Sequence, residues 1–159
     1  MKKKFWSALA IILCVMIFAV GMTACSDNLG AKVGEVTIAI ECKTILQNQN
    51  MDKAEPGLID NKLIPSDGII LNESAVDIFE KDNVLTVLKR VCKQNKIYLD
   101  ADSSYVKAIN HIYEMSVGES SGWLYFVNGL QPNVGANQYK LKGGEKIVFA
   151  YTCVVGDLK

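Results

Sequence analysis

The sequence has one histidine, His111, and no Gly-x-Ser-x-Gly, Cys-x-x-Cys or His-x-x-x-His spacing. It also has no glycine-rich loop of the kind that holds phosphate groups. Nucleophilic hydrolysis, zinc binding and nucleotide binding each need such residues at fixed spacings. These absences therefore predict a protein that is not an enzyme and that holds no metal and no cofactor.

An excess of basic residues is also absent. The chain has 17 Lys and Arg against 17 Asp and Glu, and residues 1–24 hold three of the lysines and none of the acids. The remainder has 14 basic and 17 acidic groups, a net charge of −3. Nucleic acid binding needs clustered Lys and Arg, so we expect no nucleic acid partner. The same balance argues against direct binding to an anionic membrane surface.

The longest apolar run, residues 8–20, has 13 residues. A membrane-spanning helix needs about 20 residues, whereas the apolar region of an export signal needs about 7–15. Three lysines precede this run, and the small residues Thr23 and Ala24 follow it. These features predict a signal peptide over residues 1–24.

Residues 22–25, Met-Thr-Ala-Cys, look like a bacterial lipobox, in which the cysteine becomes the lipidated first residue of the mature chain. We therefore expect lipid attachment at Cys25, a lipidated tether over residues 25–34, and anchoring at the extracytoplasmic face of the cell membrane. One alternative is an ordinary signal peptide with a cysteine near its cleavage site. Another is an uncleaved helix over residues 5–24, which gives the same topology.

Three cysteines follow the lipobox: Cys42, Cys92 and Cys153. An odd number allows at most one disulfide within the chain, and Cys42–Cys153 is the candidate pair. The alternatives are three buried thiols that act as small apolar side chains, or a metal site with His111, which no spacing favours.

Apolar residues alternate with other residues near both ends of the domain. The apolar positions are Val36, Ile38, Ile40 and Cys42 in residues 35–43, and Ile147, Phe149, Tyr151 and Cys153 near the C-terminus. Alternation is typical of a strand with one buried face. Because these two strands are the most apolar, we expect them at the centre of a sheet.

A helical pattern lies between them, with Asp82 or Asn83 as its cap and Asn95 as a left-handed stop. Its apolar positions, spaced for one helix face, are Val84, Val87, Leu88, Val91 and Cys92. Lys89, Arg90 and Lys93 fall off that face and are interpreted as solvated. Further strands are predicted over residues 69–71, 75–80, 105–115 and 123–127, and residues 47–65 are expected to be irregular. One helix against a mixed sheet is an α+β arrangement of the β-grasp kind, here spanning residues 35–159.

Residues 121–129, Ser-Gly-Trp-Leu-Tyr-Phe-Val-Asn-Gly, resemble the signature of the transcobalamin-like C-terminal domain family. Residues 87–92, 139–147 and 151–153 resemble the family's helix, the segment before its last strand and the end of that strand. The resemblance covers about residues 35–156 and implies a β-grasp fold. Many family members are bacterial surface lipoproteins, in agreement with Cys25.

The resemblance also implies kinship to the smaller domain of vitamin B12 carriers, which closes over the corrin ring. Those carriers hold the ligand between two domains, so a lone small domain is expected to bind weakly or with a partner. Many relatives have cysteines at the positions of Val117 and Ala136. Their joint absence predicts loops that are less restrained.

Candidate ligand-binding residues follow from this segment and its neighbouring loops: Trp123, Tyr125, Asn128, Asn133 and Tyr139. The rings of Trp123 and Tyr125 share one strand face, where they form either part of the core or a flat platform for a planar ligand. Our hypothesis is a membrane-anchored extracytoplasmic binding module for a corrinoid (cobalamin-like) or other small planar ligand, shared with a second surface protein. The alternative is a cell-surface module that binds a protein or the wall and has no small-molecule ligand.

Overall fold

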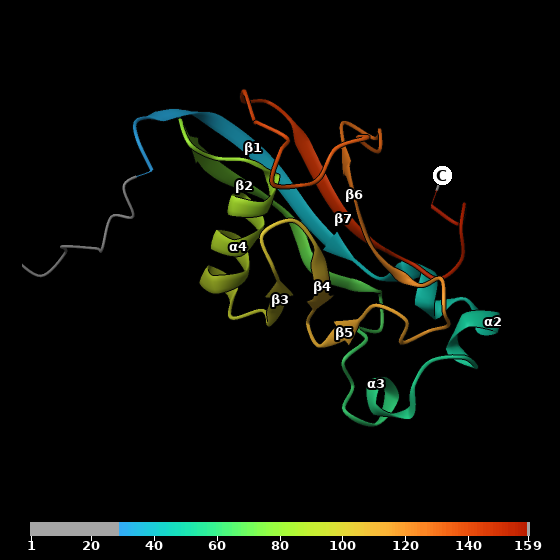
Figure 1. Ribbon diagram of the computed structural model, residues 1–159. Coiled ribbons are helices and arrows are strands. Elements are labelled where there is room, and N and C mark those ends of the chain that lie inside the picture. The colour runs from blue at the N-terminus through green and yellow to red at the C-terminus, as the bar shows by residue number, and fades with distance from the viewer. Residues whose placement is uncertain (1–28, 159) are drawn as a thin grey trace, which may run out of the picture.

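The computed structural model describes residues 29–158, so the predictions for the signal peptide and Cys25 lie outside the described residues. The domain contains two sheets and one long helix (Figure 1). The strands of the larger sheet, in the spatial order β2-β1-β7-β6, are β2 (Ile69–Phe79), β1 (Lys32–Glu41), β7 (Lys146–Thr152) and β6 (Gly122–Val127). The smaller sheet contains β3 (Leu99–Ala101), β4 (Val106–Ile109) and β5 (Ile112–Tyr113).

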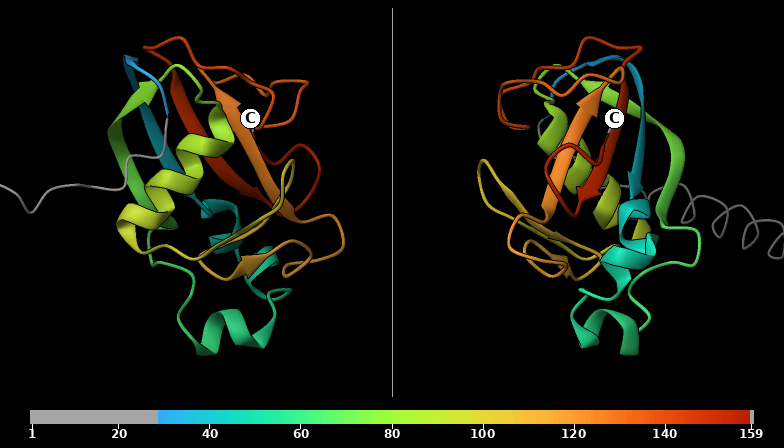
Figure 2. Two further views of the ribbon diagram at one scale, coloured as in Figure 1. Left: turned by 60° about the vertical axis from the view of Figure 1, so that its left-hand side comes forward. Right: turned by 90° about the vertical axis from the view of Figure 1, so that its right-hand side faces the viewer.

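The long helix is α4 (Val84–Asn95), which packs on one face of the larger sheet (Figure 2). The short helical segments are η1 (Lys43–Leu46), α2 (Asn48–Met51) and α3 (Pro56–Asp60). No helix within residues 29–158 has the length and apolar character that crossing a membrane requires.

The predicted α+β class and its central strand pair are confirmed. β1 pairs in parallel with β7 and antiparallel with β2, while β6 and β7 are antiparallel. Alternate side chains of β1 and β7 are buried in the same apolar core as the inner side of α4: Val36, Ile38, Ile40, Ile147, Phe149 and Tyr151. The first and last strands of the domain therefore lie side by side at the centre of a mixed sheet, as their apolar alternation predicts.

Helix α4 begins as predicted and ends one residue later than expected. The Asn83 side chain accepts a hydrogen bond from the Thr86 backbone N–H, and the Thr86 hydroxyl accepts one from the Asn83 N–H, each at 2.9 Å. Asn95 is not the left-handed residue, because its side-chain amide donates to the Val91 carbonyl and keeps it in the last turn. Lys96 takes that role with φ 56°.

Other boundaries differ from the sequence-based expectation. β1 begins at Lys32, so the last residues of the expected tether belong to the sheet. The two predicted strand segments at 69–80 form one strand, β2, and residues 47–65 contain α2 and α3. Residues 105–115 form a hairpin, because Asn110 and His111 both have positive φ and make the two-residue turn between β4 and β5.

Cys42, Cys92 and Cys153 are free thiols in the structure, and all three are buried. The Cys42–Cys153 disulfide is not formed. Burial raises the pKa of Cys42 to about 12, with Cys153 adding to the shift, and burial raises the pKa of Cys92 to about 12. The thiols are therefore protonated and pack as small apolar side chains.

We expect Gly68→Ala to lower the free energy of unfolding by about 2–4 kcal/mol. Gly68 has φ +69°, and an added Cβ would lie 2.7 Å from the Lys43 Cα. The clash is with backbone, and the Gly68 carbonyl also accepts a hydrogen bond from the Cys42 N–H at 2.7 Å. Urea unfolding followed by circular dichroism measures the change. Gly144→Ala is the control, since Gly144 has φ +84° and an added Cβ would meet nothing within 4 Å. Equal losses for the two variants would contradict the clash.

Candidate ligand-binding groove

The loop that follows β6 starts in a tight turn. Asn128 and Gly129 have φ values of 51° and 79°. Asn128 donates its backbone N–H to the Lys146 carbonyl at 2.8 Å, and its side-chain oxygen accepts from the Lys146 N–H at 2.9 Å. Val127 and Leu130 exchange backbone hydrogen bonds across the turn at 2.8 and 3.0 Å. Asn128 is thus used to shape the loop and to fix its first residues on the start of β7.

The far end of the loop is fixed to helix α4. The first N–H groups of a helix need partners outside the helix. The Val84 N–H donates to the Tyr139 carbonyl at 3.2 Å, and the Leu85 N–H donates to the Ala136 carbonyl at 3.0 Å. Ala136 itself is buried. Hydrogen bonds to the helix therefore restrain this loop without a disulfide.

Between these two fixed ends the loop borders an open groove of about 460 Å³. Its lining residues are Val127, Asn128, Leu130, Gln131, Pro132, Asn133, Val134 and Tyr139. Leu130 is 75% exposed and Val134 is 41% exposed. Three of the predicted binding residues, Asn128, Asn133 and Tyr139, therefore meet at one groove whose lining combines apolar side chains with amides.

Trp123 lies in the core and not in this groove. Its side chain is 6% exposed, and its indole N–H donates to the Ile112 carbonyl at 2.8 Å. The ring packs edge-on against Tyr151 with centroids 5.2 Å apart. Trp123 and Tyr125, two of the predicted binding residues, border a separate, smaller cavity of about 140 Å³ together with Tyr105. An indole enclosed in this way is an anchor of the sheet, and its polar atom is already bonded.

Tyr125 connects the core to the groove. Its ring stacks on Phe149 with centroids 5.9 Å apart, and its hydroxyl donates to the Val134 carbonyl at 2.6 Å. Burial, together with Tyr139, raises the pKa of Tyr125, so the hydroxyl remains a donor. The Tyr139 ring meets the Tyr125 ring edge-on at 6.5 Å. Tyr139 is thus the aromatic side chain that reaches the groove, while Tyr125 holds the loop that forms its wall.

A second aromatic cluster lies on the smaller sheet and was not predicted. The Tyr98 ring stacks on His111 with centroids 3.9 Å apart and an interplanar angle of 14°. The hydroxyls of Tyr98 and Tyr113 are hydrogen-bonded at 2.8 Å. The Asn110-His111 turn places the imidazole on this exposed stack. Within the described part of the chain, no group of three His, Cys, Asp or Glu side chains could hold a metal ion.

The fold and the loop together define an α+β, β-grasp-like domain with a preformed groove. The model of a family described as "Domain of unknown function (DUF4430)" matches residues 81–153. No curated protein matches the chain.

Two solved structures are similar to this chain. One is haptocorrin in complex with Cbi, with 12% identity and a TM-score of 0.47, where the match covers 81% of this chain and 28% of haptocorrin. The other is a protein from Ruminococcus gnavus ATCC 29149, provisionally described as metal binding, with 11% identity and a TM-score of 0.41. That match covers 75% of this chain and 96% of the other. The chain thus spans little more than a quarter of the length of haptocorrin.

Proposed function

We propose that the protein is a membrane-anchored, extracytoplasmic binding module, not an enzyme, that holds a small ligand in the groove bordered by residues 127–139. The observation that carries this proposal is the combination of a restrained loop with outward-facing apolar side chains. Leu130, Pro132 and Val134 lie on a segment fixed at both ends by hydrogen bonds. When a binding site is already formed before the ligand binds, no conformational entropy is lost in ordering its loop, and the affinity is higher.

The lining of the groove favours a ligand with a flat apolar face and a polar edge. Leu130 and Val134 offer apolar contact, and the Tyr139 ring offers an aromatic one. The side-chain amides of Gln131 and Asn133 have no hydrogen-bond partner among residues 29–158 and are free to bind polar groups at the edge. A few polar groups around an apolar surface are typical of small-molecule sites.

The ligand class that we propose is a corrinoid (cobalamin-like) or another small planar molecule. Support comes from residues 121–129, which resemble the transcobalamin-like signature and end in the Asn128-Gly129 turn that starts the groove. The groove is open, so it covers one face of such a ligand. A second surface protein would cover the other face.

The location is part of the same proposal. The order of basic residues, apolar run and lipobox supports lipidation of Cys25 outside the cytoplasm. Two or more acyl chains would anchor the protein stably, since each buried CH₂ contributes about 0.8 kcal/mol. The mass of the N-terminal peptide from membranes measures whether Cys25 carries the lipid.

Leu130→Asp is expected to weaken ligand binding at least about tenfold, because an unpaired carboxylate would face the apolar side of the ligand. The full-length protein in detergent, titrated with cobalamin and with cobinamide in a calorimeter, provides the measurement. The urea midpoint should stay nearly unchanged, since Leu130 is exposed. Val155→Asp is the matched control, as Val155 is 92% exposed and does not line the groove.

Two results would count against this proposal. Equal affinities for Leu130→Asp and Val155→Asp would show that the ligand binds elsewhere. If neither cobalamin nor cobinamide binds saturably, the isolated protein does not bind corrinoids.

A second candidate function, binding to a protein or to the cell wall, is favoured by the sheet face opposite α4 (Figure 2). Ala39, Leu71 and Val148 lie there around an open hollow of about 420 Å³. The ion pair of Lys146 with Glu73 lies at its rim. Such a face with apolar centre and charged edge resembles a small protein interface. Capture of an envelope protein that is lost in Val148→Asp and retained in Leu130→Asp would favour this second function.

A further inference from the structure

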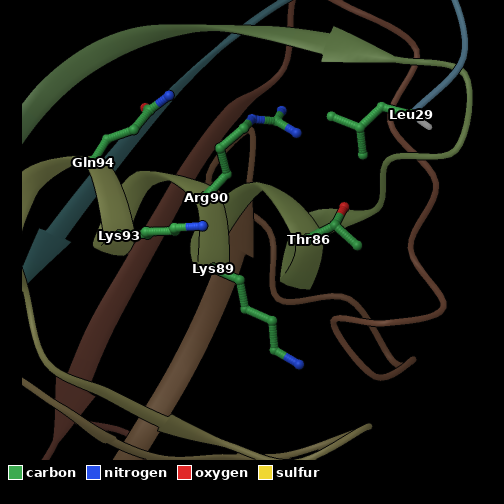
Figure 3. A pocket seen from close by; sticks show the side chains of 6 residues that line it. All are labelled: Leu29, Thr86, Lys89, Arg90, Lys93 and Gln94. Carbon is green, nitrogen blue, oxygen red and sulfur yellow. The ribbon is translucent and has the colours of Figure 1, made fainter. Parts of the chain in front are cut away.

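The outward side of helix α4 borders an open hollow of about 660 Å³ (Figure 3). Its lining residues are Leu29, Thr86, Lys89, Arg90, Lys93 and Gln94. The helix has no acidic residue, and its two exposed lysines, Lys89 and Lys93, lie one turn apart.

The basic side chains on this side of α4 differ in whether their charge is already paired. Arg90 is bound through both terminal nitrogens to the Asp82 carboxylate, at 3.0 and 2.7 Å, so its charge is already compensated. Lys89 donates to the Asp102 carbonyl at 3.3 Å. Within residues 29–158, neither Lys89 nor Lys93 takes part in a salt bridge. The two ammonium groups therefore form a local positive site without a carboxylate partner, on a chain whose net charge of −3 argues against membrane binding by the domain as a whole.

The position of Leu29 ties this side of the helix to the membrane anchor. The Leu29 carbonyl accepts from the Lys81 N–H at 3.3 Å, and the Ala31 carbonyl accepts from the Glu80 N–H at 3.0 Å. These bonds fix the start of the described chain beside the β2–α4 connection. Cys25 precedes Leu29 by four residues, so their Cα atoms are at most about 15 Å apart. A lipid on Cys25 would hold the Leu29 end of the hollow within that distance of the head groups.

We infer that the outward side of α4, with Leu29, Lys89 and Lys93, docks on anionic phospholipid head groups of the membrane that carries the anchor. The inference rests on the proposed lipidation of Cys25. At physiological salt the attraction between a lysine and an anionic surface extends over about 8 Å. The short tether allows the lysines to come that close to the head groups. Glycerophosphate oxygens match the charge of the two ammonium groups, and the Leu29 side chain provides an apolar contact beside them.

Docking in this way would use a surface separate from the ligand groove. In Figure 1 the loop that follows β6 crosses the top of the domain and returns to the start of β7, and its far end is hydrogen-bonded to the first turn of α4. The groove and the hollow on α4 have no lining residue in common. A soluble ligand or a second surface protein could then reach Leu130 and Tyr139 without displacing the membrane contact.

Energy transfer from a dye on the protein to dye-labelled lipid head groups tests this docking. The full-length acylated protein is placed in vesicles of phosphatidylcholine, alone or mixed with phosphatidylglycerol. Gln94→Cys carries the dye at the hollow and Gln131→Cys carries it at the groove, since Cys42, Cys92 and Cys153 are buried. We expect higher transfer from position 94 than from 131 in the anionic vesicles, and a loss of that excess in about 1 M salt.

Charge reversal provides the second measurement. Lys89→Glu/Lys93→Glu should shift the ratio of docked to undocked protein by at least about 25-fold, as each lysine contributes about a factor of five near an anionic surface. Lys53→Glu/Lys62→Glu is the matched control, because these exposed lysines lie in the α2–α3 region, away from α4 (Figure 1). It should leave the transfer unchanged.

The outcomes separate this inference from the proposed function. Acylated protein whose transfer from position 94 is the same in both vesicle types, or is unaffected by Lys89→Glu/Lys93→Glu, overturns the docking alone. A mass spectrum without diacylglycerol on Cys25 overturns the anchoring, and the docking with it. Neither result bears on ligand binding by the groove.

Discussion

Replacing Trp123 with alanine should lower the free energy of unfolding by about 3–5 kcal/mol. The indole is enclosed by the core, next to the Tyr151 ring and a cavity of about 140 Å³. Its loss would enlarge that cavity and leave the Ile112 carbonyl without its donor. Urea unfolding followed by far-ultraviolet circular dichroism measures the change without depending on tryptophan emission.

Trp123→Phe separates packing from ligand contact. It keeps an aromatic ring but removes the donor to Ile112, so we expect a loss of about 1–3 kcal/mol. Ligand affinity should stay within about twofold of the wild type, because the residue does not line the groove. A variant with unchanged stability and much weaker binding would place the ligand on Trp123 and not at Leu130.

The sequence predicted which residues of β6 share a face. It did not predict which of the two faces is buried. Trp123 and Tyr125 lie on one face and Leu124 and Phe126 on the other, as period-two geometry requires. The neighbouring strand decides which face is buried: Trp123 pairs with Tyr151 and Tyr125 with Phe149, and both partners lie in the core. That pairing joins segments more than twenty residues apart, so local sequence could not reveal it.

The groove was predictable only in part, because an irregular loop has no period. Asn128, Asn133 and Tyr139 were expected from their side-chain chemistry, and the structure brings them to one hollow. Leu130 and Val134 were missed, since an apolar residue in a loop is usually assigned to packing. Their outward position follows from the turn at Asn128-Gly129 and from the Tyr125 hydroxyl that binds the Val134 carbonyl.

Asp82 also acquired a role that the sequence did not predict in full. It was a candidate helix cap, yet Asn83 caps α4 and Asp82 is buried. Its carboxylate accepts from the Phe79 N–H at 3.0 Å, from the Thr86 hydroxyl at 2.8 Å and from both terminal nitrogens of Arg90. Arg90 lies in the second turn of α4, and its guanidinium also sits over the Phe79 ring, 5.2 Å from the ring centroid. The carboxylate thus joins the end of β2 to the first turns of α4.

The pH dependence of this joint follows from its hydrogen bonds. Burial by itself would raise the pKa of Asp82, but the hydrogen bonds from Arg90, Phe79 and Thr86 outweigh it and lower the pKa below the ordinary value of 3.8. A carboxyl with a lowered pKa in the folded state stabilises the fold above its unfolded pKa. That contribution is lost as the pH falls from about 3.8 through the lower native pKa.

Asp82→Ala should accordingly lower the free energy of unfolding at neutral pH by about 3–5 kcal/mol, because it leaves the partly buried Arg90 guanidinium without its counter-charge. Asp82→Ala/Arg90→Met should recover part of that loss, since no unpaired charge remains.

Urea midpoints measured from neutral pH to below 3.8 should show a shallower acid decline for Asp82→Ala than for the wild type. Asp77→Ala is the control, as Asp77 pairs with Lys32 on the exposed surface, and it should change little. If the double variant were no more stable than Asp82→Ala, the cost would come from lost packing at the β2–α4 joint and not from the unpaired charge.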